Sequence, residues 1–356
     1  MRAHLRTAAI FACTAGLLAA FLWNANLADV WHEVRAAQPW LLLLSLAFQG
    51  VTYTLRAVRW RVLLEPVGTV RFGNALRATV IGFAANTLLP ARAGEVLRPY
   101  LLARREGLRA TAAFATIIVE RFLDLAMVVL LFGVFVLAAD AATLEADPKL
   151  FAAVRAAGRA AAALAVAVLV VFAVLAGHPE RLGALTDRLT RALPARIGNA
   201  LVHAVKTFAE GLAVMRRPAL VLQALALSVP VWLSIAATIW LVARAFHITM
   251  PPTGTFLVVA LLTVGVAVPT PGAVGGFHYA FRLATTVFYG VPNERAVGAA
   301  IVLHAISFFP VAIVGLLVMA REGLSLGGLR RMAERGGEAV DADQPPNGPG
   351  KEGTLP

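Results

Sequence analysis

Three ionisable residues interrupt the apolar segment "TIIVERFLDLAMVVLL", namely Glu120, Arg121 and Asp124. At about 1.5 Å per helical residue, Glu120 lies roughly 15 Å from Thr111, near the middle of a membrane about 30 Å thick. Each charge at that depth costs about 2.5 to 3.5 kcal/mol, so the three side chains must be paired or hydrated. Glu120 and Asp124 share a helix face, and Arg121 can pair with Asp124.

A second charged segment, "LPARAGEVLRPYLL", supplies Arg92, Glu95 and Arg98. We expect the arginines of both segments to line a cavity for an anionic group while the carboxylates orient them. Phosphate suits this set, because the planar fork of arginine matches its oxygens. The candidate substrate-binding residues are Arg92, Glu95, Arg98, Glu120, Arg121 and Asp124. The alternative is a structural ion-pair cluster that ties the two segments together.

Composition places these residues in an integral membrane protein. Of the 356 residues, 59% are hydrophobic and 15% charged, and the mean hydropathy is +0.76, which excludes a soluble domain of this length. The net charge of +12 comes from Lys and Arg in short connections, which indicates topology signals and anionic-lipid contacts rather than nucleic-acid binding. No cofactor or metal motif occurs, and a lone cysteine, Cys13, excludes an internal disulfide.

The apolar blocks predict an all-α polytopic fold with about six full spans. These spans are 7–25, 40–57, 110–138, 154–176, 219–243 and 297–320. The first is expected to be an uncleaved signal anchor. We expect residues 1–322 to form one transmembrane domain and 323–356 to form a disordered cytoplasmic tail. The loop 178–217 has a helical leucine period and lies either on the inner leaflet or against the protein.

Two further apolar regions, 73–103 and 254–291, do not fit as single spans. Arg2 and Arg6 place the N-terminus in the cytoplasm. The same rule then places a group of later arginines inside: Arg56, Arg59, Arg61, Arg71 and Arg77. A full crossing by 73–89 would leave the arginines between 92 and 109 outside, against the positive-inside rule. A hairpin that returns to the cytoplasm removes the conflict, and both termini are then cytoplasmic in a bacterial inner (plasma) membrane.

Proline and glycine mark the tips of both hairpins. Pro90 lacks an N–H, and Gly94 accepts backbone angles that other residues avoid. The second region repeats the device with Pro269, Pro271, Gly272, Gly275 and Gly276. Two re-entrant helical hairpins from opposite faces suggest an inverted repeat with a binding site at their breaks. The alternative is chance, because both residue types are common in membrane helices.

Other polar residues at depth are secondary candidates for the site. His278 and His304 could relay a proton, or each could be a hydrogen-bonded packing residue. The full secondary set is Asn86, Tyr100, His278, Tyr279, Arg282 and His304.

Four motifs in order, "RAVRWRVLL", "NTLLPARAGEVLRPYLL", "ERFLDL" and "PTPGAVGGFHYAF", resemble the lysylphosphatidylglycerol synthase transmembrane-region family of flippase-like proteins. The resemblance runs from about Arg2 to Arg321. It implies movement of a lipid between leaflets. Bifunctional members carry a fused acyltransferase domain, and we expect a stand-alone unit here. His278 stands where the family pattern usually has an acidic residue, which puts a carboxylate role there in doubt.

The leading expectation is a lipid flippase or transporter without its own nucleotide site, rather than an enzyme. Its partners would be membrane lipids with an anionic phospholipid or isoprenoid-linked headgroup, and a lipid-modifying enzyme. One alternative is a membrane-embedded glycosyl or acyl transferase that uses a polyprenyl-phosphate or lipid donor, with Asp124 or Glu120 as general base. Another is a non-transporting scaffold for lipid-synthesis enzymes.

Overall fold

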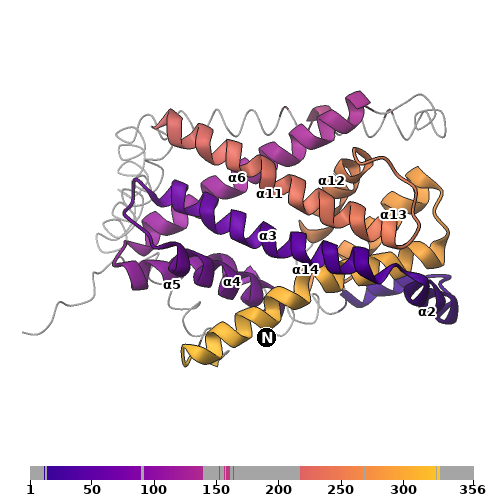
Figure 1. The fold of residues 1–356 in the computed structure, drawn as a ribbon, viewed down its shortest axis with the longest axis horizontal. Helices are drawn as coiled ribbons and strands as arrows, with labels where there is room; N and C mark the ends of the chain where they lie inside the picture. The colour runs from indigo at the N-terminus through magenta and orange to yellow at the C-terminus, as the bar shows by residue number, and fades with distance from the viewer. Residues whose placement is uncertain are drawn as a thin grey trace, which may run out of the picture.

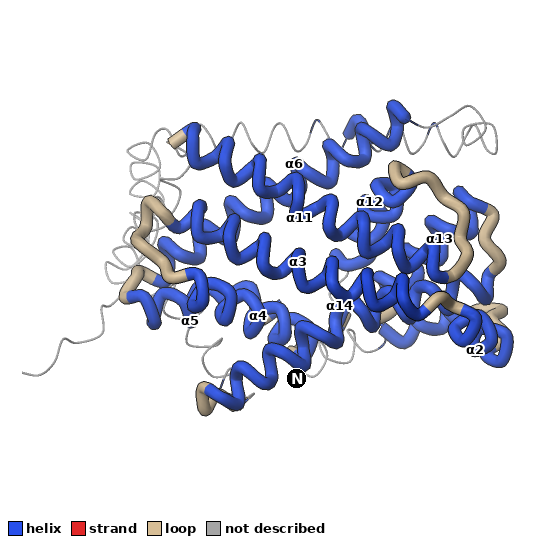
Figure 2. Tube along the Cα trace, viewed as in Figure 1, coloured by secondary structure: helices blue, strands red, loops and turns tan. Residues whose placement is uncertain are grey.

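A computed structural model describes residues 12, 14–89, 92–138, 217–267, 270–325 and 327–328, and scattered positions between 152 and 163. Every regular element in these residues is a helix, which confirms the all-α prediction (Figure 2). Within the first predicted span, 7–25, the chain is helical from residue 14 to residue 22. The span 154–176, apart from residues 156, 158–160 and 163, lies outside the described residues, as do nearly all of the loop 178–217 and the tail from residue 329.

Four described helices are long and apolar enough to cross a membrane. They are α3 (Pro39–Leu64), α6 (Ala110–Ala138), α11 (Pro218–Ala245) and α14 (Asn293–Arg321). They match the predicted spans 40–57, 110–138, 219–243 and 297–320. With 26 to 29 residues each, they reach about 40 Å, which is more than the hydrocarbon core requires.

The first hairpin consists of α4 (Phe72–Leu88) and α5 (Gly94–Glu106), which pack against each other. With 17 residues, α4 is at the lower limit for a full crossing, and α5, with 13, is too short for one. Their outer ends meet, because the Glu106 carboxylate accepts hydrogen bonds from the Arg71 backbone N–H at 3.1 Å and from the Asn74 amide at 2.7 Å. The chain therefore enters and leaves this hairpin at one end of the bundle, as the charge pattern predicted.

The second hairpin consists of α12 (Gly254–Ala267), the short 3-10 helix η3 (Pro271–Ala273) and α13 (Gly276–Tyr289). Its outer ends also meet, since the Tyr289 side chain covers Gly254. Pro90 and Pro269 lie outside the described residues. The turn between the arms has positive φ at Gly272 (59°) and Gly275 (89°), so these two glycines supply the backbone freedom that was predicted for them.

The hairpins lie at opposite ends of the bundle (Figure 1). The backbone N–H of Gln38 donates to the Ala245 carbonyl at 3.0 Å, so α3 begins where α11 ends. The first hairpin follows the end of α3 and the second follows the end of α11. The helix α2 (Leu27–Ala36) lies at the second end, where Glu33 pairs with Arg295 at 2.9 Å. We call the two ends the α5 end and the α2 end.

The two halves of the described bundle repeat one pattern in inverted orientation. Each half has a long helix, two short helices and a second long helix, in the order α3 to α6 and α11 to α14. In this repeat α4 is the counterpart of α12, and α6 is the counterpart of α14. The contact of α4 with α14 is therefore equivalent to the contact of α12 with α6, and both occur. The central helices α3 and α11 share a 2.7 Å hydrogen bond between Thr52 and Ser234, which are 182 residues apart. Gly94 and Gly276 begin the second arms of the two hairpins and have the same separation.

Gly94 was predicted to supply backbone angles that other residues avoid, and this reason for its presence was wrong. Gly94 is the first residue of α5 and does not have a positive φ. It packs directly on α4, where a Cβ would overlap the carbonyl oxygen of Gly82. Gly276 packs on Gly265 in the same way in the second hairpin. These glycines allow close contact of the two arms, as small residues do between membrane helices.

Candidate functional site

Four arginine side chains converge on one carboxylate oxygen of α6, Glu120 Oε1. Arg121 Nη2 lies 2.7 Å from it and Arg98 Nη1 lies 2.9 Å from it. The guanidinium groups of Arg59 and Arg56 follow at 3.4 and 3.9 Å. Glu120 is fully buried, so this oxygen joins α3, α5 and α6 inside the bundle.

Asp124, one turn further along α6, is the second acid of this cluster. Its Oδ1 accepts from Arg59 Nη1 at 2.8 Å and from the Trp232 indole N–H of α11 at 3.0 Å. Its Oδ2 lies 3.3 Å from Arg121 Nη2 and 3.5 Å from Arg56 Nη1. We call these residues the charged cluster: Arg56, Arg59, Arg98, Glu120, Arg121 and Asp124.

The positions predicted for two members of the charged cluster were wrong. The topology rule put Arg56 and Arg59 in a cytoplasmic connection, but α3 continues to Leu64 and buries both. Arg61, by contrast, is exposed and donates to the Val70 carbonyl at 2.9 Å. The spacing of Arg56 and Arg59 puts both on one helix face. That spacing was the available signal for a buried pair.

Pairing offsets the cost of burying six charges near the middle of the bundle. Each of them alone would cost about 2.5 to 3.5 kcal/mol at a helix centre, and each is within ion-pair distance of at least one opposite charge. Arg98 also stacks on Trp60, with 4.0 Å from its guanidinium carbon to the ring centroid. Part of the charged cluster therefore holds the helices together, as the structural alternative proposed.

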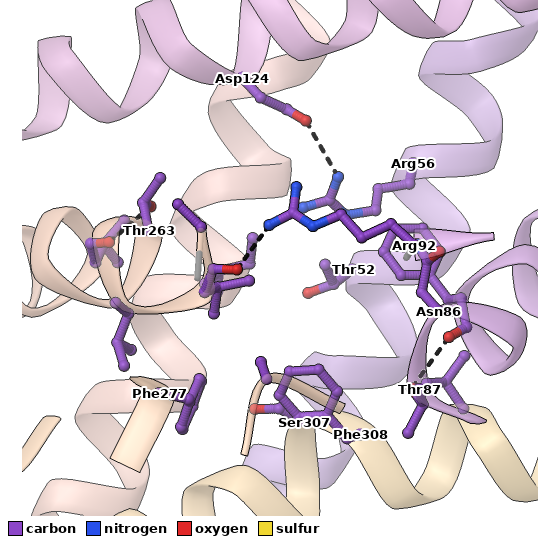
Figure 3. Close-up of a pocket in the computed structure, with 18 of the residues that line it drawn as sticks. Thr52, Arg56, Asn86, Thr87, Arg92, Asp124, Thr263, Phe277, Ser307 and Phe308 are labelled. Carbon is purple, nitrogen blue, oxygen red and sulfur yellow. Dashed lines mark hydrogen bonds and ion pairs between the residues drawn. The ribbon is translucent and has the colours of Figure 1, made fainter. Parts of the chain in front are cut away.

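The other side of the charged cluster faces a cavity of about 450 Å³. Arg56, Arg121 and Asp124 line it, while Arg59, Arg98 and Glu120 lie behind this layer. Figure 3 shows Arg56 directed at Asp124 on one side, with Phe277 and Phe308 on the side away from Asp124. The cavity thus has a charged wall and an aromatic wall.

Arg92 and Glu95 line the same cavity from the tip of the first hairpin. They pair at 3.7 Å. Arg92 has a φ of 53°. This conformation costs a non-glycine residue free energy, and it persists only where contacts of the residue compensate for that cost. Its Nη2 crosses to the second hairpin and donates to the Val266 carbonyl at 2.7 Å (Figure 3). The tips of the two hairpins are therefore joined at the cavity.

A polar contact between α3 and α14 lies on the cavity wall. The side chains of Gln49 and Tyr53 both donate to the Ser307 carbonyl, at 3.2 and 3.1 Å. All three residues line the cavity. This wall offers hydroxyl and amide groups beside aromatic rings, which suits an amphipathic ligand.

The secondary candidates fall into different places. Asn86 lines the cavity. Tyr100 is half-buried on α5 and Tyr279 is exposed on α13. Arg282 donates to the carbonyls of Ala20 and Phe21, both at 2.8 Å, and so caps the first helix. Tyr100, Tyr279 and Arg282 do not line the cavity.

The rings of His278 and His304 are in contact in a tilted arrangement, with centroids 4.4 Å apart. His304 Nε2 lies 2.8 Å from the Gly272 carbonyl oxygen, and His278 Nδ1 accepts from the Gly275 N–H at 3.3 Å. Both rings thus hold the break of the second hairpin, and neither lines the cavity. These contacts support the packing alternative, and the proton relay stays a prediction.

The arrangement is suited to binding an anion. No group of three or more His, Cys, Asp or Glu side chains placed to hold a metal ion occurs in the part of the chain that the structure describes. Guanidinium groups, in contrast, reach the cavity from α3, from α6 and from the first hairpin. Such groups bind phosphate through charge-assisted hydrogen bonds.

The sequence of this chain is similar to a family model and to two known proteins. The family model described as "Lysylphosphatidylglycerol synthase TM region" matches residues 7–315. "Glycosyltransferase AglD" of Haloferax volcanii is 29% identical over 305 residues, which cover 78% of this chain and 48% of that protein. "UPF0104 membrane protein MJ1595" of Methanocaldococcus jannaschii is 29% identical over 102 residues, which cover 28% of this chain and 30% of that protein. The chain therefore matches about half the length of the first of these relatives and less of the second.

Proposed function

We propose that this chain, which belongs to the lysylphosphatidylglycerol synthase transmembrane-region family, binds the anionic headgroup of a membrane lipid and moves it between leaflets. The chain is a multi-pass membrane protein. One observation carries the proposal: two hairpins from opposite ends of the bundle meet at a cavity that is lined by arginine side chains.

The size and lining of the cavity support this proposal. Its volume of about 450 Å³ is within the range of small-ligand sites, about 300 to 1,000 Å³. In this proposal Arg56, Arg92 and Arg121 contact the phosphate. Arg98 and Glu120 act from behind as positioning residues. The acyl chains remain in the surrounding lipid.

The inverted repeat supports movement as well as binding. In transporters of this design, one half rocks against the other around a fixed site near the membrane midplane. The bond from Arg92 to the Val266 carbonyl joins the two halves at the cavity. An incoming phosphate would compete for the Arg92 guanidinium, which would release the second hairpin.

The alternative of a transferase has one observation in its favour, the name of the Haloferax relative. The proposed general bases fit it poorly. Glu120 lies behind the cavity lining, and both oxygens of Asp124 already face arginine side chains. The scaffold alternative predicts that neutral substitutions in the cavity have no effect on lipid movement.

Reconstitution into liposomes tests the proposal. A fluorescent phosphatidylglycerol is added to the membrane, and the fraction that a membrane-impermeant quencher reaches is followed over time. We expect Arg121→Gln to slow movement at least tenfold, while Arg295→Gln at the α2 end keeps the wild-type rate. Wild-type rates in Arg121→Gln would contradict the proposal. Glycosyl or acyl transfer by the wild-type protein without lipid movement would favour the transferase.

A further inference from the structure

We infer that the headgroup carries two negative charges, as a lipid phosphomonoester or diphosphate does, and that a phosphodiester lipid is the weaker ligand. This inference rests on the proposed function and names its substrate class. Its basis is a surplus of positive charge in the charged cluster.

The charged cluster contains four arginines and two carboxylates. Among the described residues, the ion pairs of these arginines reach only Glu120 and Asp124. The other two charges at the cavity, Arg92 and Glu95, pair with each other. The four arginines share two carboxylates, so the charged cluster keeps a net charge of +2.

Side chains of the described residues do not relieve this surplus. Arg59 and Arg98 are 0% and 3% exposed. The Nε and Nη2 atoms of both, and the Nε of Arg121, are buried and have no hydrogen-bond partner among the described atoms. Buried charged donors without partners are strongly unfavourable. An anion in the cavity would offset the net positive charge of the cluster through Arg56 and Arg121, the two of its arginines that line the cavity.

The cavity is where that anion meets the charged cluster. The Arg121 side chain is 38% exposed and the Arg92 side chain 45% exposed, and Arg56 lines the cavity beside them. A phosphomonoester presents three acceptor oxygens and up to two negative charges. A phosphodiester presents two such oxygens and one charge. The three guanidinium groups and the surplus of two charges fit the monoester.

The aromatic wall of the cavity, opposite the charged wall, distinguishes a lipid from free phosphate. Phe277 and Phe308 lie on it, and their rings offer a small inorganic anion no charged partner. They suit the first carbon atoms of an acyl or prenyl chain that is attached to the phosphate. We therefore assign a lipid as the source of the phosphoryl group.

Binding of three ligands to the purified full chain in detergent tests the inference. The ligands are dioleoyl phosphatidic acid, dioleoyl phosphatidylglycerol and inorganic phosphate, measured at pH 8, where the second proton of a phosphomonoester is lost. Native mass spectrometry counts the bound lipid. We expect phosphatidic acid to bind at least tenfold more tightly than phosphatidylglycerol, and more tightly than inorganic phosphate.

Two variants at one position separate charge from folding. Arg121→Gln removes one surplus charge, so the preference for phosphatidic acid should fall at least threefold while phosphatidylglycerol still binds. Arg121→Lys keeps the charge and should keep the preference.

The outcomes separate this inference from the proposed function. Equal affinity of the wild-type protein for the two lipids would overturn the charge inference and leave the proposed function standing. Binding of neither lipid would overturn both. Inorganic phosphate that binds as tightly as phosphatidic acid would overturn the assignment of a lipid source.

Discussion

The guanidinium group of Arg92 donates to the backbone carbonyl of Val266 at 2.7 Å, and this bond joins the tip of the first hairpin to the end of α12. The two residues belong to different halves of the inverted repeat. Their contact lies at the cavity, because both residues line it. Ligand binding and the relative position of the halves are therefore coupled through one side chain.

Removal of this bond should loosen the tips. Spin labels at Leu88→Cys on α4 and Val264→Cys on α12, in a Cys13→Ser background, report the distance between the two hairpins by pulsed electron paramagnetic resonance. We expect Arg92→Gln to broaden the distance distribution. Arg121→Gln is the control, because Arg121 has no hydrogen bond or ion pair with the second hairpin among the described residues. An unchanged distribution in Arg92→Gln would show that the bond does not hold the tips.

The close contact of the hairpin arms predicts opposite effects at two glycines of one hairpin. A Cβ at Gly94 would overlap the Gly82 carbonyl, whereas a Cβ at Gly73 has nothing within 4 Å. Gly94→Ala should lower the free energy of unfolding by about 1 to 3 kcal/mol through overpacking. Gly73→Ala, near the start of α4, should be neutral or stabilising by up to about 1 kcal/mol. Thermal unfolding in detergent measures both, and equal midpoints would contradict the packing account.

The charged cluster predicts a large cost for removing one acid. Glu120→Gln leaves four arginines with one carboxylate, and loss of one partner of a buried ion pair typically costs about 3 to 5 kcal/mol. Glu33→Gln removes a partly exposed partner, since the Glu33 side chain is 22% exposed, and should cost no more than about 1 kcal/mol. The free energies of unfolding of the two variants check this difference. If they agree, the cluster does not hold the helices together.

Hairpin topology predicts which positions face the same solution. Thr69 precedes α4 and Arg104 is near the end of α5, and both are exposed. Single cysteines at these positions should be labelled from the same side of the membrane, predicted to be the cytoplasm. A cysteine at Pro252, which is exposed before α12, should be labelled from the opposite side. Labelling of positions 69 and 104 from different sides would require α4 and α5 to form one crossing.

The fold was largely predictable because charge and apolar length constrain it strongly. The span predicted at 110–138 has the bounds of α6. The first hairpin followed from arginines after residue 90 that a full crossing would have placed on the wrong side. Both arguments use only local composition, which the sequence displays directly.

The interior of the site was less predictable, because its partners come from distant helices. The positive-inside rule predicted a cytoplasmic position for Arg56, Arg59 and Arg61 alike. In the structure the first two pair with Asp124 of α6, and Arg61 does not. Gly94 resembled a turn residue, although its contact is with Gly82 across the hairpin. Only the packing of α3, α5 and α6 distinguishes these cases.

The most direct measurement is an experimental structure of the full chain in a lipid nanodisc that contains phosphatidic acid. We expect phosphoryl density in the cavity, within hydrogen-bond distance of the guanidinium groups of Arg56 and Arg121. Arg92 should then have turned from the Val266 carbonyl toward the phosphoryl group. A cavity filled by an acyl chain, with every lipid phosphate at the membrane surface, would contradict the account.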